Sequence, residues 1–207
     1  MQVHVTSHPL LLHKLSHLRK KETSSADFRR IINELSSMLA YEVTRDLTTD
    51  DQPIETPLEK TKAPFLNQKI TIVSILRAGE GLLPGFMQML PIASVGHIGL
   101  YRDKFIHGTV EYYFKVPTDI EGRTVFLLDP LLATGTTACA AIERLKQYGV
   151  GPIRLISLIA APEGIHLLEK EHPDISVYAI AIDRELSEKG YILPGVGDAG
   201  DRLFGTL

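Results

Sequence analysis

The pattern of apolar and polar positions along the chain predicts a sheet whose strands are buried on both faces. Four runs of β-branched and other apolar residues carry this pattern, at residues 69–76, 123–129, 153–160 and 175–182. Stretches of helical composition at 136–148, closed by Gly149, and at 162–170 separate the last three runs. Because strands and helices alternate, we predict an α/β fold with a doubly wound, mainly parallel sheet.

Four further segments have patterns of their own. Apolar residues from Phe28 to Leu39 recur every three or four positions, which predicts a helix with one buried face beginning near Ser24. Three prolines in residues 48–68 indicate a connection or a short hairpin. Residues 109–116 alternate aromatic and polar side chains, as an antiparallel strand does. The closing residues 191–207 contain four glycines and one proline, and we predict no regular element there.

Composition narrows the class of protein. The 207 residues carry 22 Lys and Arg against 25 Asp and Glu, a net charge of −3, so we expect neither a nucleic acid nor a membrane as partner. The single Cys139 permits no internal disulfide, and no apolar run approaches the roughly 18 residues that cross a bilayer. We therefore expect a cytoplasmic protein. Because no repeat or linker divides the chain, we also expect a single domain over residues 1–207.

The strongest local motif is LLDPLLATGTTACA at residues 127–140. A buried strand ends there at Asp129, and a short loop with three threonines leads into a helix. The unpaired backbone N–H groups of a helix N-terminus and the nearby hydroxyl groups suit a phosphate. The loop has neither the Gly-Lys-Ser/Thr of a P-loop nor the pattern G-x-G-x-x-G. The alternative interpretation is a threonine-capped turn that binds nothing.

This loop resembles the phosphoribosyl diphosphate (PRPP) binding loop of the type I phosphoribosyltransferases. Its form, with Pro130 after the aspartate and Leu132-Ala133 before the Thr-Gly, is similar to that of the uracil phosphoribosyltransferases. Other segments also resemble the uracil phosphoribosyltransferases and follow one another in the same order as in that family. The most specific is the closing YILPGVGDAGDRLFGT at 191–206. The others are HPLLLHKLSHLR near the N-terminus and residues 74–85, 99–103, 111–117 and 160–165. The resemblance covers essentially the whole chain.

The resemblance implies a type I phosphoribosyltransferase fold. Its core would span about residues 69–185, with a small hood from the N-terminal segment and residues from about 186 to 207. The implied reaction transfers ribose 5-phosphate from PRPP to uracil N1 and yields UMP and pyrophosphate. Mg²⁺ would be the cofactor, held mainly through PRPP and not by protein ligands. Members of the family form homodimers or higher homo-oligomers, and GTP activates some of them.

The resemblance also implies which residues contact PRPP. Asp129 would hold the ribose hydroxyl groups. Two guanidinium groups, those of Arg77 and Arg102, would meet the pyrophosphate. A cis peptide bond is expected between Ala78 and Gly79. The loop would wrap the 5′-phosphate through Ala133, Thr134, Gly135, Thr136 and Thr137. Pro130, Leu131 and Leu132 would also contact PRPP.

Uracil recognition is implied for the closing motif. The Ile192 carbonyl would accept a hydrogen bond from uracil N3–H, and the Gly197 and Ala199 N–H groups would donate to O4. Asp198 would act in catalysis with Arg77 and Asp129. It would either accept the N1 proton or contact the ribose and the metal. The non-functional alternative is that Asp198 only forms a turn and has no helix to cap.

Besides Lys104, which stands where the family has an acidic residue, two residues depart from the family pattern. Thr136 stands where uracil phosphoribosyltransferases usually have Gly, and it restores the T-G-x-T form of the wider superfamily. Glu80 stands where they usually have an apolar residue, and beside the pyrophosphate it would either repel the substrate or help to place Mg²⁺. These departures leave open a second class of function, a catalytically weak regulator that senses PRPP or nucleotide.

Overall fold

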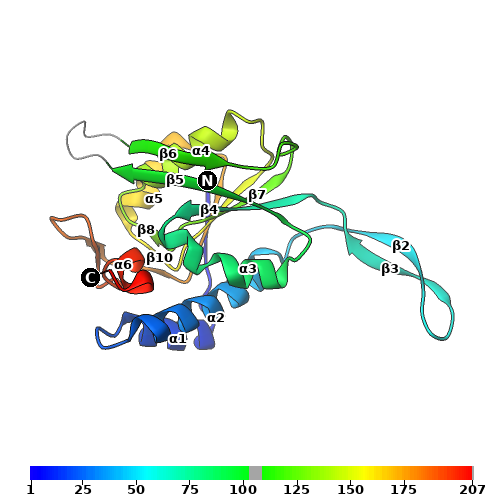
Figure 1. The fold of residues 1–207 in the computed structure, drawn as a ribbon, viewed down its shortest axis with the longest axis horizontal. Helices are drawn as coiled ribbons and strands as arrows, with labels where there is room; N and C mark the ends of the chain where they lie inside the picture. Colours follow the sequence, from blue (N-terminus) through cyan, green and yellow to red (C-terminus); the bar gives the residue numbers. More distant parts are fainter. Residues whose placement is uncertain (103–108, 207) are drawn as a thin grey trace.

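The computed structural model describes residues 1–102 and 109–206. Its main sheet has seven strands in the order β1-β11-β9-β7-β4-β5-β6 (Figure 1). The strands are β1 (Gln2–Val5), β4 (Ile70–Leu76), β5 (Ser94–Arg102), β6 (Thr109–Lys115), β7 (Thr124–Leu128), β9 (Ile153–Ile156) and β11 (Ser176–Ala179). Only the edge pair β5–β6 is antiparallel among these described strands. The predicted α/β fold with a mainly parallel sheet is therefore confirmed.

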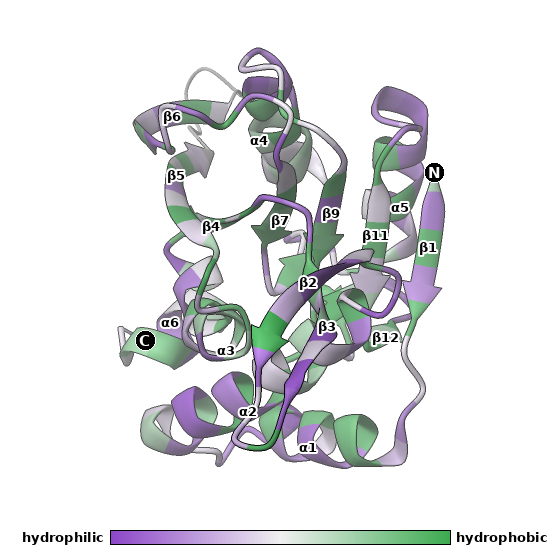
Figure 2. Cartoon of the chain, turned by 90° about the vertical axis from the view of Figure 1, so that its right-hand side faces the viewer, coloured by the Kyte–Doolittle hydropathy of each residue, from purple (hydrophilic) through white to green (hydrophobic). Residues whose placement is uncertain are grey.

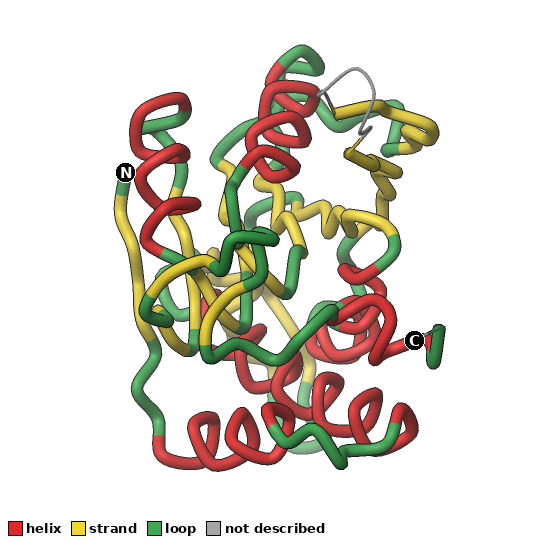
Figure 3. Tube along the Cα trace, turned by 90° about the vertical axis from the view of Figure 1, so that its left-hand side faces the viewer, coloured by secondary structure: helices red, strands yellow, loops and turns green. Residues whose placement is uncertain are grey.

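Helices cover both faces of this sheet (Figure 3). On one face lie α1 (Pro9–Arg19), α2 (Ser25–Val43), α3 (Leu83–Met89) and α6 (Ala199–Phe204), which share one apolar core with the sheet. On the other face lie α4 (Thr136–Lys146) and α5 (Pro162–Glu171), which pack in a second core. Because both faces are covered, the central strands are mainly apolar, as the green of β7 shows (Figure 2).

The strands on either side of the sheet centre connect across opposite faces. The chain leaves β4 through α3 on one face to reach β5, whereas it leaves β7 through α4 on the other face to reach β9. Strands β4 and β7 are parallel neighbours, so their carboxyl ends border a crevice from which the two connections diverge. In open α/β sheets such a topological switch point is where ligands bind.

Three strands of the main sheet are each followed by a break and then a short second strand. After a break, β7, β9 and β11 continue as the short strands β8 (Leu131–Leu132), β10 (Ile159–Ala160) and β12 (Ala181–Ile182), which form a separate three-stranded parallel sheet. The break arises because the backbone changes partners: the N–H groups of Leu158 and Ile159 both donate to the Pro130 carbonyl. The runs predicted as single strands at 153–160 and 175–182 are thus two strands each.

The β2–β3 hairpin projects from the rest of the molecule (Figure 1). Strands β2 (Thr49–Glu55) and β3 (Lys60–Leu66) pair antiparallel and are almost entirely exposed. The hairpin alternative for residues 48–68 is therefore confirmed.

The prediction that residues 191–207 contain no regular element is wrong. Strand β14 (Ile192–Leu193) pairs with β13 (Glu185–Leu186), and helix α6 follows. The helix is only six residues long, capped by the Asp198 side chain at its start and by Gly205, with φ of +68°, at its end. Burial of Leu203 offsets the weak helix propensity of the glycine-containing segment. None of the described helices is long and apolar enough to cross a bilayer.

Candidate active site

The charged residues that the sequence singled out follow the carboxyl ends of adjacent strands. Arg77 comes directly after β4 and Asp129 directly after β7, while Arg102 is the last residue of β5. Because these three strands are parallel neighbours, the three positions lie at one edge of the sheet. The backbone of Arg102 belongs to this edge, and its side chain lies outside the part that the structure describes.

The loop between Asp129 and α4 encloses a cavity of about 60 Å³. Thr134, Gly135 and Thr137 line it, and within the described residues no hydrogen bond has their N–H groups as donors. The Thr134 and Thr136 hydroxyl oxygens lie 3.0 Å apart, so Thr136 belongs to the polar rim of the loop. Free N–H groups at the start of a helix, together with hydroxyl groups, make a cavity suited to a phosphate.

Close backbone packing holds this loop in place. Gly135 has φ of +82° and caps α4, in the left-handed region that favours glycine. A Cβ at Gly135 would lie 3.0 Å from the Gly164 carbonyl oxygen, and a Cβ at Gly164 would lie 2.5 Å from that of Ala133. Helix α5 therefore buttresses the loop through a glycine-to-glycine contact that a larger residue would push apart.

Asp129 lies in an environment that disfavours its charge. The residue is half-buried and lines the 60 Å³ cavity. Burial raises the pKa of the Asp129 carboxyl to about 7, and a hydrogen bond from the Leu131 N–H opposes this shift only in part. Among the described residues no salt bridge involves Asp129, and such a carboxylate is well suited to hydroxyl donors or to a divalent ion.

Pro130, Leu131 and Leu132, directly after Asp129, contact the neighbouring strands as well as forming part of the loop. The Pro130 carbonyl accepts two backbone hydrogen bonds, and Leu132, 1% exposed, packs into the second core. Leu131 and Leu132 also form β8 and line the 60 Å³ cavity. These three residues hold the loop against the neighbouring strands.

Arg77 lies between the sheet edge and the C-terminal helix. Its guanidinium contacts the Asp201 carboxylate at 3.0 Å and the Thr206 hydroxyl at 3.4 Å. Two hydrogen bonds lower the pKa of the Asp201 carboxyl: the one from the Thr206 hydroxyl has the larger effect and the one from Arg77 the smaller. The expected position of the cis peptide bond is wrong: the bond lies between Leu76 and Arg77. Ala78 and Gly79 instead begin the 3₁₀-helix η1 (Ala78–Gly81), whose hydrogen-bonded turn is built of trans peptides.

The closing motif lines a second cavity of about 220 Å³, which we call the base cavity. Ile192, Gly197, Asp198 and Ala199, which were all predicted as base contacts, lie around it. The expectation that Asp198 has no helix to cap is wrong, because one of its carboxylate oxygens accepts a hydrogen bond from the Asp201 N–H at 2.9 Å. Asp198 is the only carboxylate among the described residues that line this cavity.

The two cavities are neighbours. Leu131 and Ala133 line both of them, and Ala78, directly after Arg77, lines the base cavity. The structure therefore brings together the ends of β4 and β7, the loop at 129–138 and the closing motif. Sequence reasoning had missed the contributions of Ala78, Tyr191 and Asp201. Ala78 and Tyr191 adjoin residues that it did select, whereas Asp201 lies two positions after Ala199.

Glu80 faces a neighbouring strand. Its Oε1 atom lies 3.3 Å from Nε2 of His97 on β5. Both side chains are about one-third exposed. Glu80 lines neither of the two cavities described above.

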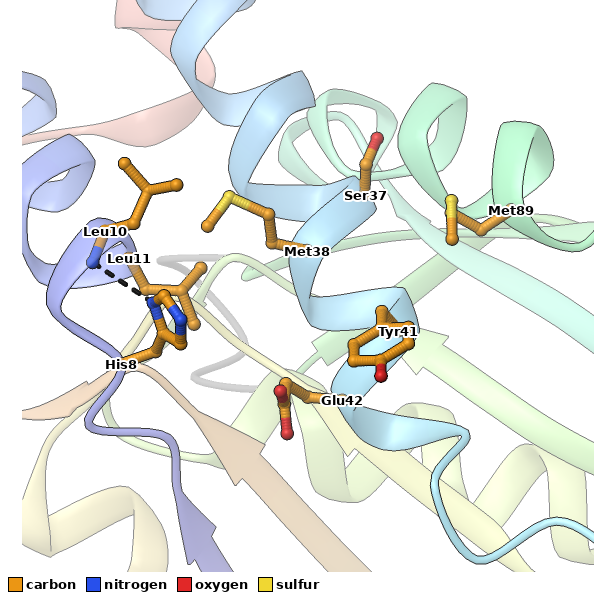
Figure 4. A pocket seen from close by; sticks show the side chains of 8 residues that line it. All are labelled: His8, Leu10, Leu11, Ser37, Met38, Tyr41, Glu42 and Met89. Carbon is orange, nitrogen blue, oxygen red and sulfur yellow. Dashed lines mark hydrogen bonds between the residues drawn. The ribbon is translucent and has the colours of Figure 1, made fainter.

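A larger, open cavity of about 390 Å³ lies elsewhere, between α1, α2 and α3 (Figure 4). Its walls are mainly apolar, with Leu11 and Met38 on one side and Met89 on the other. None of the residues predicted to bind a ligand lines it. We therefore assign the chemistry to the two smaller cavities at the sheet edge.

Comparison with solved structures identifies the fold as that of the type I phosphoribosyltransferases. A hypoxanthine phosphoribosyltransferase from Staphylococcus aureus superposes with a TM-score of 0.53 at 16% identity, over 83% of each chain, so this likeness concerns the fold alone. A protein from Aquifex aeolicus superposes with a TM-score of 0.94 at 35% identity, over 98% of each chain.

The chain belongs to the uracil phosphoribosyltransferase family, whose family model matches residues 5–206. The uracil phosphoribosyltransferase of Brucella anthropi is 55% identical over 207 residues, which cover 100% of both chains. That of Rhodococcus jostii is 53% identical over 205 residues, covering 99% of this chain and 98% of the other. These relatives do not favour the alternative of a regulator.

Proposed function

We propose that this protein transfers ribose 5-phosphate from PRPP to N1 of uracil and releases UMP and pyrophosphate. The observation that carries the proposal is the adjacency of the phosphate-sized cavity and the base cavity, which share Leu131 and Ala133. A ribose spanning this shared wall would place C1′ between a base on one side and pyrophosphate on the other. The base then attacks the face opposite the leaving group, so the anomeric centre inverts.

The loop and the strand ends would bind PRPP. The free N–H groups of the loop and the hydroxyl groups of Thr134 and Thr137 would hold the 5′-phosphate. Asp129 would accept hydrogen bonds from the ribose hydroxyl groups. Arg77 and Arg102 would bind the pyrophosphate, whose charge increases as it leaves, so their contribution grows toward the transition state.

The base would be recognised mainly by backbone groups. The Ile192 carbonyl would accept from N3–H, and the N–H groups of Gly197 and Ala199 would donate to O4. Within the described residues, no hydrogen bond has either of these N–H groups as donor. The Asp198 carboxylate, with one oxygen engaged by the Asp201 N–H, would contact the reacting end of the base with its other oxygen.

Mg²⁺ fits this site as a cofactor bound chiefly through the substrate. The described residues contain no group of three or more His, Cys, Asp or Glu side chains arranged to hold a metal ion. The Asp129 carboxyl, whose pKa burial raises, is the oxygen donor best placed for an ion that arrives with PRPP. When bound, Mg²⁺ would neutralise charge on the pyrophosphate and orient it.

We further propose that the whole chain acts as one domain and that its copies associate as a homodimer or higher homo-oligomer in the cytoplasm. The exposed β2–β3 hairpin supports association, since a two-stranded hairpin is only marginally stable by itself. GTP as an activator remains part of the proposal to be tested.

The decisive experiment measures pyrophosphate release from PRPP in the presence of Mg²⁺, with and without uracil. We expect release that depends on uracil and forms UMP in equal amount. Parallel reactions with GTP test activation. Release that is independent of uracil, or no release under any of these conditions, would contradict the proposed reaction.

A further inference from the structure

A partly buried ion pair lies next to the segment that lines the base cavity. Arg19, the last residue of α1, contacts Asp183, directly after β12, through two parallel hydrogen bonds of 2.7 Å. The Asp183 side chain is only 6% exposed. Neither residue lines the base cavity, and neither was predicted as a site residue from the sequence.

Both members of the pair bind the same peptide segment. The Gly195 N–H donates to Asp183 Oδ2 at 2.8 Å, and Arg19 Nη1 donates to the Gly195 carbonyl at 2.9 Å. The polar backbone groups of Gly195 are therefore both engaged by one ion pair. Gly195 also leaves no room for a side chain, because a Cβ there would lie 2.2 Å from the Ile192 carbonyl oxygen.

A second arginine strengthens the same connection. The buried Arg202 side chain donates to the Val196 carbonyl and to the carbonyls of Leu18 and Lys20, which flank Arg19. The end of α1 and the segment at 195–196 are thus joined by four arginine-to-carbonyl hydrogen bonds. These hydrogen bonds hold the backbone of Gly195 and Val196. Both residues lie between Ile192 and Gly197, which flank the turn proposed to face the base.

We propose that Arg19 and Asp183 form a positioning pair that sets the geometry of the base-reading backbone, and with it the affinity for the base. The inference rests on the proposed function of residues 192–199. Backbone recognition cannot adjust by rotating a side chain, so a small displacement of the Gly195 peptide misplaces the Ile192 carbonyl and the Gly197 N–H together. A displacement near 1 Å at a recognition site costs on the order of 100-fold in rate.

Arg19→Lys is the first test, because it keeps the charge but loses the planar fork that binds the carboxylate and the carbonyl at once. Asp183→Asn is the second. Arg154→Lys is the matched control, since Arg154 also makes a two-hydrogen-bond ion pair, with Asp46, and donates to a backbone carbonyl, that of Val43, remote from both cavities.

We expect Arg19→Lys and Asp183→Asn to raise KM for uracil at least about tenfold while KM for PRPP stays within about twofold. Arg154→Lys should change neither value, although it should lower Tm comparably. This split separates positioning from general loss of structure. If Asp183→Asn does not fold, Arg19→Lys decides the matter alone.

Unchanged KM for uracil in a folded Arg19→Lys variant would overturn the proposal, as would a parallel rise of both KM values. Calorimetric binding of UMP provides a readout that needs no turnover. A wild-type protein that binds UMP but releases no pyrophosphate would refute the proposed reaction, and the UMP affinities of the two variants would still test the positioning pair.

Discussion

Asp129 links the stability of the free protein to its proposed function. Its carboxyl has a pKa of about 7 in the folded protein, against an ordinary value of 3.8. Below pH 3.8 the folded and unfolded states are both protonated, and the group favours neither. Between pH 3.8 and pH 7 the unfolded chain releases the proton while the folded protein retains it. Stability is therefore lost as pH rises through this window, and above pH 7 the loss is complete.

The size of this effect follows from the pKa difference. At 1.36 kcal/mol per pKa unit, the difference between 3.8 and about 7 corresponds to about 4 kcal/mol as an upper limit. Because the residue is only half-buried, solvent screening reduces this to about 2 kcal/mol. Asp129→Asn removes the charge and keeps the shape, so it should stabilise the ligand-free protein by about 2 kcal/mol at pH 8, which is about 4–8 °C in Tm.

Thermal unfolding at pH 8 and at pH 5 tests this sign. At pH 5 the gain should be smaller than at pH 8, since part of the folded wild-type protein then carries a protonated, uncharged Asp129 carboxyl. The same variant should lose about 10- to 100-fold in PRPP affinity, the value of a charge-assisted hydrogen bond to the ribose. Asp119→Asn is the control: Arg123 lowers the pKa of the exposed Asp119, which precedes β7 at the opposite end of the sheet.

We expect no stabilisation and no loss of activity in the Asp119 variant. A gain in Tm for Asp129→Asn that is the same at both pH values, or no gain at pH 8, would show that burial of the charged Asp129 carboxylate does not destabilise the folded protein.

Three further predictions concern the loop and the base. Thr134→Ala or Thr137→Ala should each weaken PRPP binding by about 1.5–3 kcal/mol and change KM for uracil much less, and unchanged PRPP affinity in both would reduce the loop to a capped turn. In Gly164→Ala the new Cβ would lie 2.5 Å from the Ala133 carbonyl oxygen, which must move until the two atoms are about 3.4 Å apart, and this shift should lower PRPP affinity about tenfold or more. The control Glu169→Ala, on the exposed side of α5, should have no effect. Cytosine reverses both hydrogen-bonding positions of uracil, so kcat/KM for uracil should exceed that for cytosine by at least about 100-fold, and a ratio below about ten would contradict backbone recognition.

Local patterns predicted the parts of the fold whose formation depends on nearby residues. Apolar runs identified the central strands, because a strand buried on both faces has apolar residues at successive positions. Apolar residues at helical spacing identified α2, because a helix buried on one face has apolar residues every three or four positions. The short strand β1 left no such trace: it lies at the sheet edge, is mostly exposed, and exists through its pairing with β11. Helix α6 was missed for the same reason, since packing and two caps outweigh its composition.

The candidate site shows the same division. The sequence by itself predicted a phosphate site in the loop at 129–137 from the types and spacing of its residues, and it predicted a base site in the closing motif from the resemblance of that motif to the uracil phosphoribosyltransferases. Only the tertiary structure brought these two segments to one edge of the sheet, and only it paired Arg77 with Asp201, 124 positions away, and Arg19 with Asp183, 164 positions away. Neither pair has a local pattern, because each partner is selected by the packing of whole elements and not by its neighbours in the chain.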